Sequence, residues 1–124
     1  MHQQVVFYVN HPTQVAIEYY LRDPKHYQKL STFYQAKRDL FLEAISTSRF
    51  TFVPTQGSYF QLLDYTAISD QGDVEFARQL TIDYKIASIP ISVFMNGKDP
   101  RKLRFCFAKE DHELLKAAQI LNRL

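Results

Sequence analysis

An arginine stands inside an otherwise apolar strand pattern, in the run Lys-Leu-Arg-Phe-Cys-Phe-Ala over residues 102–108. Side chains of a strand alternate between its two faces. One face comprises Leu103, Phe105 and Phe107, and the other comprises Arg104, Cys106 and Ala108. An unpaired guanidinium is unfavourable in apolar surroundings, and its planar fork matches a carboxylate through two parallel hydrogen bonds. The pattern therefore indicates a receptor for an anion supplied from outside the strand.

Two structural roles would also account for this arginine. The guanidinium could form an ion pair with a distant acid of the same chain, such as Asp64 or Glu110. It could also bend out into water, as long charged side chains commonly do. The strand pattern alone leaves these alternatives open beside the receptor role.

No complete catalytic constellation accompanies the arginine. The sequence contains no Gly-x-Ser-x-Gly motif, no Gly-rich phosphate loop and no His-Glu-x-x-His motif. Cys106 has no obvious histidine partner, and on a half-buried strand we expect it to act as a small hydrophobe. The four histidines lack metal-ligand spacing with one another or with Cys106. We therefore expect no catalytic residue and no metal site within this chain.

Composition limits the class of protein. The 124 residues are long enough for one domain, and a composition of 46% hydrophobic and 23% charged residues is ordinary for a globular chain. Ten Phe and eight Tyr indicate abundant packing surface, some of it at interfaces. A net charge of +2 without a long basic run argues against nucleic acid. A sheet that stacks RNA bases on Phe105 and Phe107 is a weaker idea, because those rings belong to the apolar face.

The single cysteine and the lack of long apolar runs bear on location. Cys106 cannot form a disulfide within the chain, which favours a reducing, cytoplasmic setting. No apolar run approaches the length of a membrane span, and the first residues lack a signal-peptide pattern. We expect neither a membrane nor nucleic acid among the partners.

Hydrophobic spacing predicts alternating helices and short strands. The expected helices cover residues 12–22, 25–47 and 73–84, and a fourth begins at Asp111. The expected strands cover 50–53, 59–65, 86–88 and 102–108. The first two strands would form a hairpin through a turn at 54–57, and residues 90–101 would be a loop. This order indicates an α+β domain, a small mixed sheet covered by helices.

Caps and apolar stripes complete the expected elements. Side chains between Ser69 and Asp73 would cap the third helix, and Asp111 would cap the last. The stripes that should face the core contain Leu30, Phe33, Leu40, Phe41 and Ala44, then Phe76, Ala77, Leu80 and Tyr84, and finally Leu114, Leu115, Ala118 and Leu121. The first two helices should also carry exposed aromatic side chains, namely Tyr19, Tyr20, Tyr27 and Tyr34.

Several motifs together resemble a known family. The run from Arg104 to Glu110 follows Ile-Pro-Ile-Ser-Val-Phe at 89–94, and Gly-Ser-Tyr-Phe-Gln-Leu-Leu-Asp-Tyr at 57–65 follows a Pro-x-x-Gly turn. Gln-Ala-Lys-Arg-Asp at 35–39 and the segment from His2 to Gln14 come earlier, in the family's order and spacing. The set resembles the C-terminal segment of pyridoxal-phosphate-dependent aminotransferases of fold type I. The likeness is strongest to the methionine and kynurenine aminotransferase branch, and it covers essentially the whole chain.

The resemblance assigns roles to three residues. At the position of Arg104, the family has an arginine that grips the α-carboxylate of the amino acid or 2-oxo acid substrate. At the positions of Phe7 and Tyr8, it has an aromatic pair near the active site of the neighbouring subunit. The resemblance thus implies Arg104, Phe7 and Tyr8 as substrate-binding residues, the fold of a fold type I small domain, and a homodimer or self-association.

The chain departs from the family in one respect. Family members hold pyridoxal phosphate as a Schiff base on a lysine in a Ser-x-x-Lys context, and no lysine of this chain stands in that context. We therefore expect residues 1–124 to be the small domain with a short lead-in, and the large cofactor-binding domain to be missing. Pyridoxal phosphate would act in the complete enzyme but would not bind this chain, which alone would be inactive. The alternative is a stand-alone module that binds small carboxylates or a partner without catalysis.

Overall fold

The computed structural model describes residues 9–124. These residues fall into two compact units, divided between Phe33 and Tyr34. The first unit contains helix α2 (His11–Leu21) and the 3₁₀ turn η1 (Pro24–His26). Helix α3 (Leu30–Ala44) begins in the first unit and continues into the second. The second unit then adds β1 (Phe60–Asp64), α4 (Asp73–Tyr84), β2 (Ile89–Pro90), η2 (Ser92–Phe94), β3 (Lys102–Cys106) and α5 (Asp111–Leu121).

Helix α2 confirms the first predicted helix within one residue at each end. The Asn10 side chain accepts a hydrogen bond from the Thr13 amide at 3.0 Å, and a proline occupies the first turn. No residue of this helix is buried. Tyr19 and Tyr20 are exposed, as expected, and so is Tyr27.

The predicted helix over 25–47 is two elements instead of one. Asp23 caps the short η1 turn, and α3 begins only at Leu30. The first part of the predicted apolar stripe is also wrong, because Leu30 and Phe33 are about half exposed. Phe41 is buried, and Tyr34, Leu40 and Ala44 pack against the core. The core-facing stripe of α3 therefore lies within the second unit.

The second unit contains a three-stranded sheet in the order β1-β3-β2. Strand β3 is central and runs antiparallel to both neighbours. The α+β class is confirmed, but every strand pair among residues 9–124 is antiparallel, whereas the sequence pattern predicts a mixed sheet. In this register, Leu63 of β1 lies opposite Leu103 of β3 on one face of the sheet. Leu62 lies opposite Arg104 on the other face.

The predicted strand over 50–53 and its hairpin are wrong. Only Thr51 bridges to Asp64, and residues 52–55 lie outside any strand. Pro54 has no N–H for a ladder. The buried Gln61 amide donates to the Val53 carbonyl at 2.9 Å and accepts from the Thr55 amide at 3.1 Å. A side chain therefore replaces the strand partner that this segment lacks.

The strand predicted at 86–88 is displaced to Ile89–Pro90. Lys85 takes a left-handed conformation after α4, and the Ile86 amide donates to the Leu80 carbonyl at 3.0 Å. Ile86 is thus used to end the helix, so pairing with β3 starts three residues later. A proline is tolerated in β2 because this strand lies at the edge of the sheet.

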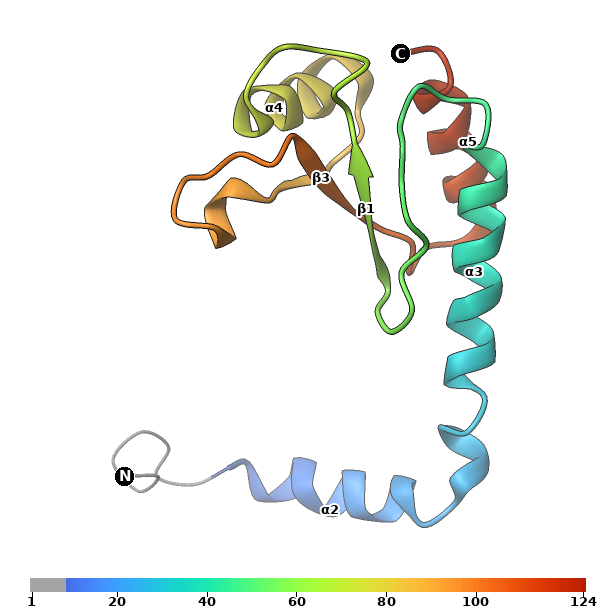
Figure 1. Cartoon of the computed structure of the whole chain (residues 1–124). Coiled ribbons are helices and arrows are strands. Elements are labelled where there is room, and N and C mark those ends of the chain that lie inside the picture. Colours follow the sequence, from blue (N-terminus) through green and yellow to red (C-terminus); the bar gives the residue numbers. More distant parts are fainter. Residues whose placement is uncertain (1–8) are drawn as a thin grey trace. The chain divides into compact units, whose positions relative to one another are not determined.

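Helices cover one face of the sheet (Figure 1). Helices α3 and α5 lie side by side, joined by a Lys37–Asp111 ion pair at 2.7 Å and by Asn122 donating to the Ala44 carbonyl at 2.9 Å. The shared core contains Phe41, Leu42, Ile45, Phe50, Leu63, Tyr65, Phe76, Ala77, Leu80, Ile86, Leu103, Phe105, Phe107, Leu114, Ala118 and Leu121. This confirms Leu103, Phe105 and Phe107 as the apolar face of the arginine strand. Tyr84 and Leu115, predicted for the core, are exposed instead.

The helix caps differ from those predicted. Gly72 is the N-cap of α4 and offers no side chain, so the distant Asp99 carboxylate accepts from the Asp73 amide at 2.8 Å. Glu110, not Asp111, is the N-cap of α5, and it forms a capping box with Glu113. Both helices therefore begin among carboxylates, which the helix dipole favours.

Adjacent leucines of β1 test the two-layer arrangement. Leu63 is fully buried in the core, whereas the Leu62 side chain is 43% exposed on the opposite face. We expect Leu63→Ala to lower the free energy of unfolding by about 2–5 kcal/mol, because it leaves a cavity, and Leu62→Ala to lower it by less than about 1 kcal/mol. Urea unfolding followed by circular dichroism measures both values. Equal losses in the two variants would contradict the assignment of the faces.

Candidate functional site

The register of the sheet fixes the neighbours of Arg104. Leu62 of β1 and Ile89 of β2 lie directly opposite it on either side. Phe60 pairs with Cys106 and is therefore the diagonal neighbour of Arg104 on the same face. This face lies opposite the helix-covered core, so Arg104 is half-buried rather than enclosed.

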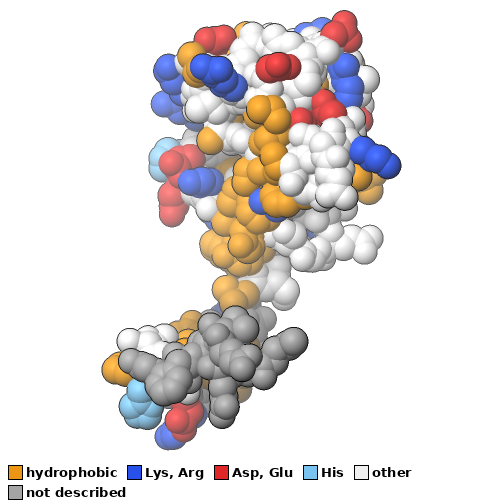
Figure 2. Space-filling model, turned by 90° about the vertical axis from the view of Figure 1, so that its left-hand side faces the viewer, with side chains coloured by type: hydrophobic (Ala, Val, Ile, Leu, Met, Phe, Trp, Pro, Cys, Tyr) orange, Lys and Arg blue, Asp and Glu red, His pale blue; other side chains and the backbone are white. Residues whose placement is uncertain are grey.

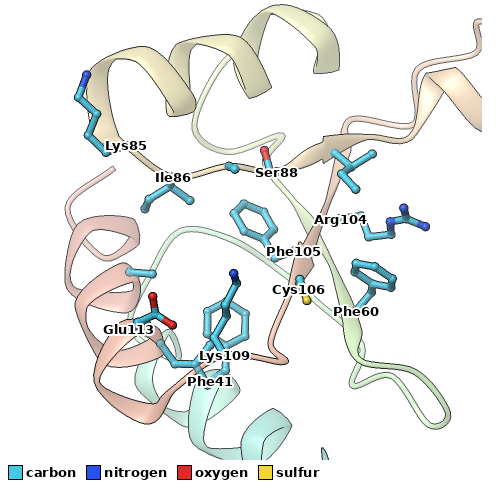
Figure 3. Close-up of a pocket in the computed structure, with 14 residues that line it drawn as sticks. Phe41, Phe60, Lys85, Ile86, Ser88, Arg104, Phe105, Cys106, Lys109 and Glu113 are labelled. Carbon is cyan, nitrogen blue, oxygen red and sulfur yellow. The ribbon is translucent and has the colours of Figure 1, made fainter.

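Two phenylalanine rings contact the Arg104 guanidinium. Its central carbon lies 4.2 Å from the ring centre of Phe60 and 4.8 Å from that of Phe94. Both distances are within the range in which a cation is attracted to an aromatic face. Figure 3 shows the Arg104 side chain beside the Phe60 ring, with the guanidinium directed away from the ribbon of β3. The planar group is thus held against carbon surfaces and not against an acid.

No ion pair or hydrogen bond within residues 9–124 includes the Arg104 side chain, and its Nε is buried without a partner. Of the two acids named as structural partners, Asp64 accepts from Thr66, and Glu110 is the N-cap of α5. Neither acid binds the guanidinium. A cation that has no acid partner within residues 9–124 is suited to an anion from elsewhere.

A pocket of about 480 Å³ begins beside Arg104 and extends toward α5. It is lined by Phe41, Phe60, Lys85, Ile86, Ala87, Ser88, Ile89, Arg104, Phe105, Cys106, Lys109, Glu113, Leu114 and Ala117. Figure 3 shows Arg104, Phe60 and Cys106 on one side of it and Lys109 and Glu113 on the other. The Ser88 hydroxyl is buried in this wall without a hydrogen-bond partner in residues 9–124. The pocket therefore combines apolar walls with polar groups free to bind a ligand.

Hydrophobic side chains also gather on the outside of the Tyr34–Leu124 unit. Figure 2 shows them as a patch on the face turned to the viewer, with Lys and Arg side chains beside it. The exposed hydrophobic residues of this unit include Val93, Phe94 and Met95 of the 91–101 loop. Phe94 therefore contacts Arg104 and is also open to solvent.

The sequence-predicted site is placed only in part. Arg104 and Cys106 lie on one face of β3, as predicted. Phe7 and Tyr8 lie outside the described residues. Sequence reasoning missed the two rings on Arg104: the pairing of β1 with β3 would have indicated Phe60, but no local signal places Phe94.

A group of carboxylates supports the 91–101 loop. Asp73 is 2% exposed, and its carboxylate accepts from the Ser92 amide and the Ser92 hydroxyl, both at 2.7 Å. Asp99 accepts from the Asp73 amide and from the Tyr65 phenol, the latter at 3.4 Å. The phenol also lies 3.1 Å from the Gln71 carbonyl. Burial, followed by the charges of Asp99 and Asp73, raises the pKa of Tyr65 to about 12.

The described part of the chain shows neither a metal-type cluster nor a membrane-spanning helix. Residues 9–124 contain no group of three or more His, Cys, Asp or Glu side chains that could hold a metal ion. In the same residues, no helix is long and apolar enough to cross a membrane.

Comparison with known proteins connects this geometry to one family. The sequence model of the family described as "Aminotransferase class I and II" matches residues 1–121. Methionine aminotransferase of Escherichia coli K12 is 45% identical over 126 residues, covering 100% of this chain and 33% of its own length. Kynurenine–oxoglutarate transaminase of Dictyostelium discoideum is 34% identical, covering 99% of this chain and 34% of its own length.

Solved structures agree with the sequence comparison. YbdL of Escherichia coli, described as having a methionine aminotransferase function, superposes with a TM-score of 0.90 at 44% identity, over 99% of this chain and 33% of its own. N-Succinyldiaminopimelate aminotransferase of Mycobacterium tuberculosis superposes with a TM-score of 0.84 at 25% identity, over 98% of this chain and 32% of its own. This chain spans about a third of the length of these four relatives.

The raised pKa of Tyr65 predicts a loss of stability at alkaline pH. The unfolded phenol titrates near pH 10, while the folded one titrates at about 12, so the unfolded state loses its proton first. The contribution of Tyr65 is therefore complete below pH 10 and decreases as the pH rises from 10 to 12. Urea unfolding at a series of pH values measures this. The slope in that window should be smaller in Tyr65→Phe than in the parent; an unchanged slope would contradict the assignment.

Proposed function

This chain belongs to the aminotransferase class I and II family, and we propose that it supplies the substrate-carboxylate grip of an enzyme that moves an amino group from an amino acid to a 2-oxo acid. Arg104 is the residue proposed to bind the α-carboxylate. The large domain, the second subunit of a homodimer and the cofactor belong to the complete enzyme. In that enzyme, Phe7 and Tyr8 would lie near the substrate site of the neighbouring subunit.

The observation that carries the proposal is the state of Arg104. Its guanidinium is half-buried, contacts two aromatic rings, and has no acid partner within residues 9–124. A structural arginine would be expected to bind one of the acids of its own chain. A receptor needs its terminal N–H groups available and its plane fixed, and ring contacts fix the plane without occupying those groups.

The role proposed for Arg104 is positioning and not bond-making. Two parallel hydrogen bonds to a carboxylate would hold the substrate in one orientation, so that its amino or oxo group is presented at a constant place. Pyridoxal phosphate, when bound in the complete enzyme, supplies the electron sink for the chemistry. Cys106 and the apolar wall of the pocket would limit the access of water to the ion pair.

The groups beside the pocket do not favour the cofactor itself. A helix N-terminus with free amides is a common phosphate site, but at α4 the Asp73 amide is bound by Asp99, and α5 begins with a Glu110–Glu113 capping box. The lysines that line the pocket, Lys85 and Lys109, are exposed, whereas a Schiff-base lysine is commonly activated by desolvation. This supports the proposal that the chain alone binds no pyridoxal phosphate and does not transaminate.

Replacing Arg104 by lysine separates the receptor role from a structural one. In the complete enzyme we expect Arg104→Lys to weaken productive carboxylate binding, measured through the fall in kcat/KM, by about 1.5–3 kcal/mol, because the charge remains but the two-pronged geometry is lost. The melting temperature should hardly change. Arg78→Lys, at an exposed position of α4, is the matched control and should leave both quantities unaltered. A large loss of stability with normal kinetics would show that Arg104 is structural.

Mixing the purified chain with pyridoxal phosphate tests the prediction that this chain alone does not bind the cofactor. We expect the absorption spectrum to remain that of the free aldehyde, because the two lysines of the pocket are exposed and carboxylates stand at the starts of α4 and α5. Borohydride treatment followed by mass spectrometry should find no stoichiometric adduct. One lysine modified at full occupancy would contradict the prediction and would place cofactor binding within this chain.

A further inference from the structure

The 91–101 loop brings Phe94 to Arg104, yet little apolar packing holds it there. Val93, Phe94 and Met95 are all exposed, with the Phe94 side chain at 61%. Internal hydrogen bonds fold the loop into compact turns, including Phe94 to Ile91 at 2.9 Å. Such bonds shape the loop, and strands β2 and β3 hold its two ends. Since apolar contacts add little, the polar contacts that attach the loop to the rest of the fold bear on where the Phe94 ring lies.

Asp73, the first residue of α4, makes the connection. Both oxygens of its carboxylate bind Ser92, one to the amide and one to the hydroxyl, each at 2.7 Å. Ser92 is the first residue of the η2 turn, which ends with Phe94. Because Ser92 is itself 9% exposed, these bonds are shielded from competing water. The start of the loop is thus attached to the buried end of a helix.

The far end of the loop returns to the same residue. The Asp99 carboxylate accepts from the Asp73 amide at 2.8 Å, and its other oxygen accepts from the Arg101 amide at 2.7 Å. Asp73 therefore holds residue 92 with its side chain and residue 99 with its backbone. The segment that contains Phe94 is thus hydrogen-bonded at both ends to the same residue, Asp73.

The burial of the Asp73 carboxylate has a free-energy cost that other interactions must offset. Its removal from water is unfavourable unless hydrogen bonds and a favourable field compensate for it. Asp73 has two short hydrogen bonds and the N-terminus of α4. Asp73 is the first residue of α4 and not its N-cap, so helix capping does not explain a carboxylate whose two oxygens both bind Ser92.

We propose that Asp73 is a positioning residue for the carboxylate receptor. It fixes the η2 turn through Ser92, the turn places the Phe94 ring on Arg104, and Phe94 together with Phe60 fixes the plane of the guanidinium. This inference rests on the proposed function of Arg104, and it adds a residue that does not touch the substrate. Without Asp73, the guanidinium keeps its charge but loses one of the two rings that orient it.

The test is an NMR measurement on the ligand-free 124-residue chain, so that it does not depend on carboxylate binding. The side-chain Nε–H signal of Arg104 should be displaced from that of free arginine by the ring currents of Phe60 and Phe94. Phe94→Ala should remove the contribution of Phe94. Asp73→Asn should shift the signal in the same direction, and Ser92→Ala should do so by a smaller amount, because it removes only the hydroxyl bond.

Two controls separate positioning from a general loss of structure. Glu75→Gln removes an exposed charge from the same helix turn as Asp73 and leaves Ser92 unchanged. Leu121→Ala weakens the core at a buried position of α5, outside the loop. Both should leave the Arg104 signal in place. If Asp73→Asn does not fold, Ser92→Ala decides the question.

The proposal is overturned if Phe94→Ala shifts the signal while Asp73→Asn and Ser92→Ala do not, because the loop would then be placed independently of Asp73. It is equally overturned if Phe94→Ala has no effect. A displaced signal that responds as predicted, combined with unimpaired kinetics in Arg104→Lys, would instead reject the proposed function and leave the anchor intact.

Discussion

The site depends on one constraint, the alternation of side chains along β3. Successive side chains of a strand point to opposite faces. Because Leu103 and Phe105 point into the core, Arg104 between them points to the open face. The apolar residues of the strand belong to one buried core with residues of α3, α4 and α5. The core therefore sets the position of the Arg104 backbone, from which the side chain extends. The guanidinium itself makes no hydrogen bond within the described residues. A one-residue slip of register would bury the charge and expose the apolar face.

The elements around the arginine divide two tasks. Strand β1 contributes Phe60 through its register with β3, a contact that is as rigid as the sheet. The 91–101 loop contributes Phe94, a contact that depends on Asp73 and Ser92. Neither ring occupies the terminal N–H groups of the guanidinium. The surroundings thus hold the fork in place while leaving it open to a carboxylate, which is the preorganisation that a substrate-positioning group needs.

Much of the second unit could be predicted from the sequence, because its signals are local. The period of the apolar residues predicts α4 at its observed bounds and the buried face of β3, and the spacing around Leu114 predicts α5. The failures have distant causes. Gln61 replaces the strand partner of residues 53–55, and Asp99 caps a helix that begins 26 residues earlier. A local pattern does not contain contacts of that kind.

The candidate site was predictable to the same extent. The alternation along residues 102–108 places Arg104 on the face opposite the apolar core, but it leaves a structural role open beside the receptor role. The rings of Phe60 and Phe94 required the strand register and the folded loop, respectively. The family resemblance supplies the chemical identity of the anion, an α-carboxylate, which no feature of the strand itself specifies.

The central claim is that Arg104 receives a carboxylate, and titration of the chain with 3-phenylpropanoate at constant ionic strength tests it most directly. The side-chain NMR signals of all arginines can be followed in one experiment. We predict a saturable shift at Arg104 that far exceeds the shifts of the exposed Arg78 and Arg123. A response at Arg104 no larger than at those two residues would contradict the account.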